Sequence, residues 1–378
     1  MFVQRLFLRV FCFLPLFFCS RQALAVDLQI HGFSDLIGSR SNTNYPVDTI
    51  NNNGGHLTVD SESRLGLNFN ADLGNRLTFA SQILAQGNGG AYNLAADWLF
   101  ATYRPFDEFA VRIGRQINPQ FLYSEQYAVG YTYLWTRLPS EVYGLNPIDS
   151  FNGVSIIYTH PWGDLEFQMQ IYGGAGDTNG QGGALSYTAT LDDNKGVELV
   201  LLSLSDKFKI RAGYNSSNPV VTEAVQVPIM QTPVGAINGT MFIPADIGTI
   251  QTFTAGTSFE WMRFEGRSEI ARIVGTSAFI RTVTGAYGTL GYRLLPFMTP
   301  YFNYAWEGGV SGSAYTFPVP SISTTQLTDK HGTTVGLNFK VSPSAVVKAE
   351  YMRTQSNFVD TSKDFGVNTY TFTFDLIF

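Results

Sequence analysis

The end of the chain, from Tyr370 onward, alternates between large apolar and polar side chains. Successive side chains of a β-strand point to opposite faces, so this spacing predicts a strand with one apolar and one polar face. The polar face carries Thr371, Thr373 and Asp375. The apolar face carries Tyr370, Phe372, Phe374, Leu376 and Phe378. We expect this two-faced strand to be the last element of the fold.

Alternation of the same kind recurs along most of the chain. In one segment Phe208 and Ile210 alternate with Lys207, Lys209 and Arg211. A face that is charged in many strands cannot be a packed core, because burying unpaired charge is costly, so this face must meet water. No stretch after the N-terminus approaches the roughly 18 apolar residues of a membrane-spanning helix. The pattern therefore predicts an all-β fold, a membrane-spanning antiparallel β-barrel with lipid outside and water inside.

The connections between these segments alternate in length. We count about 16 strands by their alternation and the turn residues between them. The expected short connections are 72–75, 105–108, 160–164, 205–207, 261–263, 295–297 and 342–344. The expected long connections are 37–61, 117–150, 174–195, 216–249, 307–329 and 355–367. Tight turns at one rim and long loops at the other are typical of bacterial barrels, and a closed ring of this size leaves a water-filled lumen.

The N-terminus has the pattern of a secretory signal peptide. Arg5 and Arg9 precede an apolar run at 10–18, and the small-residue triplet 23–25 follows. The run is too short to cross a bilayer as a helix. We therefore predict that residues 1–25 are a cleaved signal peptide.

The remaining residues, 26–378, are expected to form the barrel. Both cysteines, Cys12 and Cys19, lie in the predicted signal peptide, so we expect no disulfide, no thiolate metal site and no cofactor in the mature chain. Lipid attachment at Cys19 is disfavoured because Phe17 and Phe18 stand where small residues would be needed. The formal net charge of −6 does not suit a nucleic-acid partner.

The connection at 117–150 differs in composition from an ordinary surface loop. A loop surrounded by solvent would be mostly polar, whereas this one is rich in aromatic and aliphatic residues. We therefore expect it to fold into the barrel, pack against the wall and narrow the lumen. Its apolar residues include Tyr123, Tyr127, Val129, Tyr131, Tyr133, Leu134, Trp135, Leu138, Val142 and Tyr143.

Three features together resemble the Gram-negative outer-membrane porins: the segment Val-Arg-Ile-Gly-Arg-Gln at 111–116, a long loop after the fifth of sixteen strands, and a terminal phenylalanine. The final aromatic ladder is similar to the C-terminal assembly signature of outer-membrane proteins. The resemblance implies a homotrimer in the outer membrane, in contact with lipid and lipopolysaccharide. It also implies that the barrel-assembly machinery recognises the final strand.

In that family, acidic residues on the third long loop face basic residues on the wall, and the resulting field orients solutes in the pore. The resemblance transfers the basic role to Arg64, Arg76 and Arg112 on the wall and to Arg115 where the loop begins. It transfers the acidic role to the loop residues Glu125, Glu141 and Asp149, with Arg137 as an exception in sign. The enterobacterial loop motif Pro-Glu-Phe-Gly-Gly is replaced here by Pro-Ser-Glu-Val-Tyr-Gly at 139–144.

Three functions follow from this fold. The first is an open pore for small hydrophilic solutes and ions, which the mixed charges of the predicted lumen favour. The second is a channel selective for an anion, a sugar or a small organic acid. The third is an outer-membrane enzyme, which is disfavoured because the histidines show no catalytic spacing. These histidines are His31, His56, His160 and His331.

Overall fold

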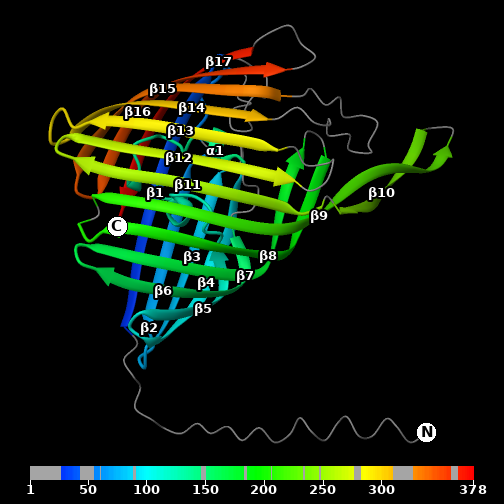
Figure 1. Ribbon diagram of the computed structural model, residues 1–378. Coiled ribbons are helices and arrows are strands. Elements are labelled where there is room, and N and C mark those ends of the chain that lie inside the picture. Colours follow the sequence, from blue (N-terminus) through cyan, green and yellow to red (C-terminus); the bar gives the residue numbers. More distant parts are fainter. Residues whose placement is uncertain are drawn as a thin grey trace, which may run out of the picture.

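The predicted strands form a closed antiparallel barrel in the computed structural model (Figure 1). The described residues are 27–42, 55–59, 61–87, 91–145, 150–182, 185–205, 207–232, 235–246, 248–275, 282–309, 327–358 and 365–378. The predicted signal peptide at 1–25 lies outside them.

The described residues form seventeen strands and three short helical segments. The first eight strands are β1 (Asp27–Ser41), β2 (Arg64–Asp72), β3 (Leu77–Gly87), β4 (Tyr92–Phe106), β5 (Phe109–Ile117), β6 (Ser150–Trp162), β7 (Leu165–Gly182) and β8 (Leu185–Ser203). The others are β9 (Phe208–Thr232), β10 (Gly235–Asp246), β11 (Ile250–Trp261), β12 (Phe264–Gly275), β13 (Val283–Tyr292), β14 (Met298–Gly309), β15 (Leu327–Ser342), β16 (Ala345–Phe358) and β17 (Phe365–Ile377). The helical segments are η1 (Ser124–Gln126), η2 (Gly130–Thr132) and α1 (Ser140–Tyr143).

Pairing of the first and last strands closes the ring. β1 pairs antiparallel with β2, as in Ile30 opposite Phe69, and also with β17, as in Leu36 opposite Phe374. Closure leaves no edge of unpaired backbone groups in the ring, which hydrocarbon would not tolerate. The ring contains sixteen of the strands in the described part of the chain, which confirms the predicted number.

The remaining strand, β10, extends the barrel rather than completing it. The first part of β9 pairs with β11 up to Ser217, and its later part, from Val220, pairs with β10. The β9–β10 hairpin therefore projects away from the ring, on the right of Figure 1.

All seven predicted short connections are confirmed as tight links between consecutive strands. The turn between β2 and β3 illustrates their geometry, because Asn75 and Arg76 both adopt a positive φ there. Two predicted long connections are partly wrong. Much of 174–195 and of 216–249 is strand, since β7, β8, β9 and β10 continue past the ring. Hairpin pairing satisfies their backbone groups despite the glycines that suggested a loop.

The two faces of the wall differ as the alternation predicts. On β17, Tyr370, Phe372 and Phe374 are exposed on the outer face, with Phe372 62% exposed. Thr371, Thr373 and Asp375 are buried on the inner face. Of the other two residues of the predicted apolar ladder, Phe378 is exposed and Leu376 is half-buried. A surface of this kind is suited to lipid.

None of the described helices is long and apolar enough to cross a membrane. In the same part of the chain, no three His, Cys, Asp or Glu side chains gather in a way that would hold a metal ion.

Candidate functional site

The connection between β5 and β6 enters the barrel, as the sequence predicted. We call residues 118–145, its described part, the inserted loop; it contains η1, η2 and α1. Its contacts run from β9 through β11–β17 to β1 and β2. We call that part of the barrel the covered wall. The strands β4–β8 form the opposite wall.

An aromatic cluster holds the inserted loop against the covered wall. Trp135 is 1% exposed, and its indole nitrogen donates a 3.0 Å hydrogen bond to Oγ1 of Thr289 on β13. Its ring meets that of Tyr287 edge to face, with 5.5 Å between the centroids. Burial of one such side chain is worth about 1.5–3 kcal/mol, and an aromatic pair adds about 0.5–1.5 kcal/mol. The cluster comprises Phe121, Leu122, Tyr123, Tyr133, Leu134, Trp135, Leu138, Val142, Ala271, Tyr287, Tyr301 and Ala305.

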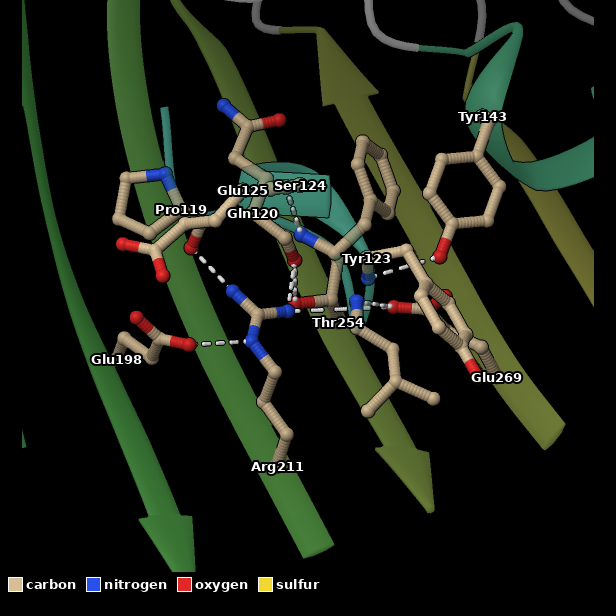
Figure 2. A network of polar contacts seen from close by, with 12 residues as sticks. Pro119, Gln120, Tyr123, Ser124, Glu125, Tyr143, Glu198, Arg211, Thr254 and Glu269 are labelled. Atoms are coloured by element: carbon tan, nitrogen blue, oxygen red, sulfur yellow. Dashed lines mark hydrogen bonds and ion pairs between the residues drawn. The ribbon is translucent and has the colours of Figure 1, made fainter. Parts of the chain in front are cut away.

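The start of the loop is fixed by an arginine on β9. The guanidinium of Arg211 donates to the backbone carbonyls of Pro119 and Gln120 (Figure 2). It also lies 2.5 Å from a carboxylate oxygen of Glu198 and is 1% exposed. Oγ1 of Thr254 on β11 donates a 2.6 Å hydrogen bond to the same Gln120 carbonyl. Arg211 therefore ties two neighbouring loop carbonyls to the wall.

The next residues of the loop are held by β12. The backbone N–H of Leu122 donates a 2.7 Å hydrogen bond to Glu269, and the backbone N–H of Tyr123 donates to the hydroxyl of Tyr143 (Figure 2). Nε of Arg267 donates a 2.7 Å hydrogen bond to the hydroxyl of Tyr123. Burial raises the pKa of Tyr123 above its ordinary value, so the phenol stays neutral.

A buried lysine on β16 anchors the middle of the loop. Nζ of Lys348 donates hydrogen bonds of 2.6 and 2.7 Å to the carbonyls of Gly130 and Trp135 and lies 2.8 Å from Asp375. The Lys348 side chain is fully buried. On β1, Asp35 accepts a 2.9 Å hydrogen bond from the Gly130 N–H. Lys348 thus binds the loop at Gly130 and at Trp135, and its charge offsets that of Asp375.

The end of the loop is equally well bound. Arg137 forms a 2.8 Å ion pair with Glu62, and Lys330 on β15 lies 3.9 Å from Glu141. Glycines make room for α1: a Cβ at Gly285 would overlap the Glu141 carbonyl, and one at Gly332 would lie 2.6 Å from its Oε1. Glu141 is therefore packed against the wall.

On the opposite wall the loop presents an exposed carboxylate. Glu125 in η1 lies 3.5 Å from Arg112 on β5, with side-chain exposures of 65% and 21%. The Arg112 guanidinium lies over the ring of Phe100, 4.3 Å from its centroid. A small recess of about 70 Å³ adjoins Glu125, and its lining includes Asp97 and Tyr127. We call the space between the inserted loop and the β4–β8 wall the passage.

The structure brings only some of the predicted site residues together. Arg112 and Glu125 meet at 3.5 Å. Arg64 also faces the loop, donating a 2.9 Å hydrogen bond to the Tyr127 carbonyl with its guanidinium over the Tyr127 ring. Asp149 lies outside the described residues.

The other described site residues lie away from the Arg112–Glu125 pair. Arg76 precedes β3 in a tight turn and pairs with Asp107 of the next turn, so it lies at the short-turn rim rather than on the lumen wall. Arg115 pairs in register with Leu99 and Asn152, two exposed residues, because the strand alternation turns it away from Arg112. Glu141 is buried against β15 instead of facing the passage.

Three of the residues that anchor the loop, Arg211, Glu269 and Lys348, were not among the predicted site residues. The sequence indicates only that these three residues occupy inward positions of their strands. Alternation identifies which face a residue occupies, but it cannot show which inward residues the loop will cover.

Comparisons with known proteins agree with this geometry. A family model described as Gram-negative porin matches residues 15–359. A search of curated proteins gives no significant match. The fold resembles the outer-membrane channel DcaP of Acinetobacter baumannii, with a TM-score of 0.60, 12% identity and coverage of 93% of this chain and 97% of that one.

Two further solved structures share the fold. The anion-selective porin from Comamonas acidovorans has a TM-score of 0.57 and 12% identity, over 93% of this chain and 100% of that one. The outer-membrane protein OmpT of Vibrio cholerae in its trimer form has a TM-score of 0.52 and 11% identity, over 93% and 99%. At these identities the likeness concerns the fold alone.

Proposed function

The chain belongs to the family of Gram-negative porins, and from this premise we propose that it is a general pore for small hydrophilic solutes and ions. As a member of the family it is located in the outer membrane and forms a channel for passive diffusion of solutes. The inserted loop narrows the channel, and solutes pass between the loop and the β4–β8 wall.

The observation that carries this proposal is the mixed charge of the passage. Arg112 on the wall faces Glu125 on the loop, and Asp97 lines the adjoining recess. A channel selective for one sign of charge would use rings of that sign. Opposite charges across the gap create a transverse field, which admits small dipolar solutes of either net charge.

Single-channel recording in planar bilayers tests the proposal. We expect linear current–voltage curves and weak ion selectivity in reversal-potential measurements. Small organic solutes at micromolar concentration should leave the current unchanged. Micromolar block by one class of solute would overturn the general pore.

The second candidate is a channel selective for an anion, a sugar or a small organic acid. The Arg112 guanidinium stacked on Phe100 favours it, because a stacked arginine is a good receptor for planar acceptor groups. The anion-selective porin from Comamonas acidovorans shares the fold. A screen of organic acids and sugars as current blockers separates this function from the first.

We also propose that the chain has no enzymatic activity. His31, His160 and His331 lie on β1, β6 and β15, on different parts of the barrel. His331 contacts Tyr304 and Asp329, but a general base also needs a positioned nucleophile or substrate cleft beside it. Incubation of the purified protein with peptide and lipid substrates should release no product above the level of an empty-membrane control.

The remaining partners are inferred from the family. We propose a homotrimer, surrounded by lipid and lipopolysaccharide and assembled through recognition of β17, whose apolar residues Tyr370, Phe372 and Phe374 face outward. The OmpT structure of Vibrio cholerae in its trimer form provides a precedent in the same fold. Conductance in three equal steps and light scattering in detergent would test the trimer.

A further inference from the structure

An aromatic platform lies on the β4 wall beside the passage. The rings of Trp98 and Phe100 stack, with 5.4 Å between their centroids and 27° between their planes. Phe100 also lies under the Arg112 guanidinium, and Arg112 faces Glu125 on the inserted loop. All three wall side chains therefore point into the lumen rather than toward lipid.

A bulge in β4 brings two successive side chains to the lumen. The register between β3 and β4 shifts between Gln82 and Ile83, so that Asp97 and Trp98 both lie near Gln82. Nε2 of Gln82 donates a 2.7 Å hydrogen bond to Asp97. A strand without the bulge would turn one of these two side chains outward, because successive residues alternate. The bulge places a carboxylate next to the tryptophan, within the lumen.

Arg112 and Glu125, beside the aromatic platform, make fewer hydrogen bonds than their side chains can form. Among the described residues, the hydrogen bond from the Arg112 side chain goes to Glu125, through one nitrogen at a long distance of 3.5 Å. A guanidinium carries five donors, and a carboxylate accepts about four hydrogen bonds. Glu125 is 65% exposed and Arg112 is 21% exposed, so the exposed part of each group retains hydrogen-bonding capacity for a solute.

The charges discriminate between classes of solute. A carboxylate that approaches Arg112 also approaches Glu125, which repels it. A hydroxyl group can accept from Arg112 and donate to Glu125 at the same time, without net charge. An aromatic ring beside such a pair also fits the C–H face of a sugar ring. Neutral polyhydroxylated solutes therefore match this site better than organic anions.

We propose that Trp98, together with the Arg112–Glu125 pair, forms a weak binding site for neutral carbohydrates in the passage. This inference rests on the proposed function, since the solute reaches the site only through an open channel. The sugar ring lies on Trp98, and its hydroxyls bridge Arg112 and Glu125. The site slows the passage of sugars without closing the channel to ions.

Current block by maltose in planar bilayers tests the site. With the purified wild-type protein we expect maltose at millimolar concentration to reduce the potassium chloride current reversibly. Trp98→Ala should weaken the block about tenfold, the size expected for loss of an aromatic contact of roughly 1–1.5 kcal/mol, whereas Trp98→Phe should restore most of it. Trp162→Ala is the matched control, because Trp162 lies at the end of β6 and is 68% exposed.

Three outcomes would overturn the site. Absence of maltose block in a channel that conducts potassium chloride normally would remove the carbohydrate site but leave the pore. Equal block of wild type and Trp98→Ala would remove the role of Trp98. Stronger block by benzoate than by maltose, increased further in Glu125→Gln, would replace the sugar with an aromatic carboxylate. Absence of ion conductance would instead contradict the proposed function, and retention of heat-resistant migration in gels verifies that each variant is folded.

Discussion

The two sides of the lumen use similar residues for different purposes. On the covered wall, Arg211 and Lys348 lie under the inserted loop, are nearly or fully buried, and donate to loop carbonyls. On the opposite wall, Arg112 faces the same loop across the passage, and its partner Glu125 is mostly exposed. An inward charge that the loop covers becomes an anchor, whereas one beside the loop remains available to solutes.

The largest effect is expected from Lys348→Ala. Removal of one partner of a buried ion pair costs about 3–5 kcal/mol, and here Asp375 and two loop carbonyls also lose their donor. We expect the loop to detach, with a lower thermal unfolding temperature, a larger single-channel conductance and faster proteolysis within the loop. Lys340→Ala, at an exposed lysine on β15, is the control. Unchanged conductance and stability would contradict the anchoring role.

A smaller effect is expected from Trp135→Phe. The substitution keeps an aromatic ring but removes the hydrogen bond to Thr289, which leaves a buried hydroxyl short of a donor and costs about 1–3 kcal/mol. The unfolding temperature measured by circular dichroism in detergent should fall, while the conductance stays near that of wild type. A loss as large as that of Lys348→Ala would show that the indole and its hydrogen bond to Thr289 hold the loop as strongly as the ionic anchors do.

Glu125→Gln should change selectivity rather than stability. An exposed ion pair contributes about 0–1 kcal/mol, so the unfolding temperature should hardly move. Removal of the loop carboxylate leaves Arg112 without its opposing charge, and we expect reversal potentials to shift toward anions about twofold in permeability ratio. Glu141→Gln should leave that ratio unchanged, because Glu141 is buried against β15. The reverse pattern would place Glu141, and not Glu125, at the constriction.

The smallest effect is expected from Arg76→Gln. Arg76 lies in the turn before β3, and its pair with Asp107 is exposed on both sides. Stability should change by less than about 1 kcal/mol, and reversal potentials should be those of wild type. A shift in selectivity as large as that of Glu125→Gln would mean that the short-turn rim also filters ions.

Sequence reasoning worked best where one rule acts locally. The alternation of side chains predicted the two faces of β17 and the seven short turns, because each depends only on neighbouring residues and on the contrast between lipid and water. It placed Arg76 on the inward face of a strand, although Arg76 lies in the turn before β3 and pairs with Asp107. It also took the glycine-rich start of 174–195 as loop, although β7 and β8 continue there as a hairpin.

By itself, the sequence determined that the chain forms a barrel with a wet interior and an apolar loop inside it, since period-two alternation and an aromatic loop leave few other ways to satisfy the backbone and bury the rings. Only the tertiary structure decided which side of the lumen the loop covers. That choice depends on contacts between residues far apart in the chain, such as Arg211 with Pro119 and Lys348 with Gly130. It separates Glu141, held against the wall, from Glu125, which faces the passage.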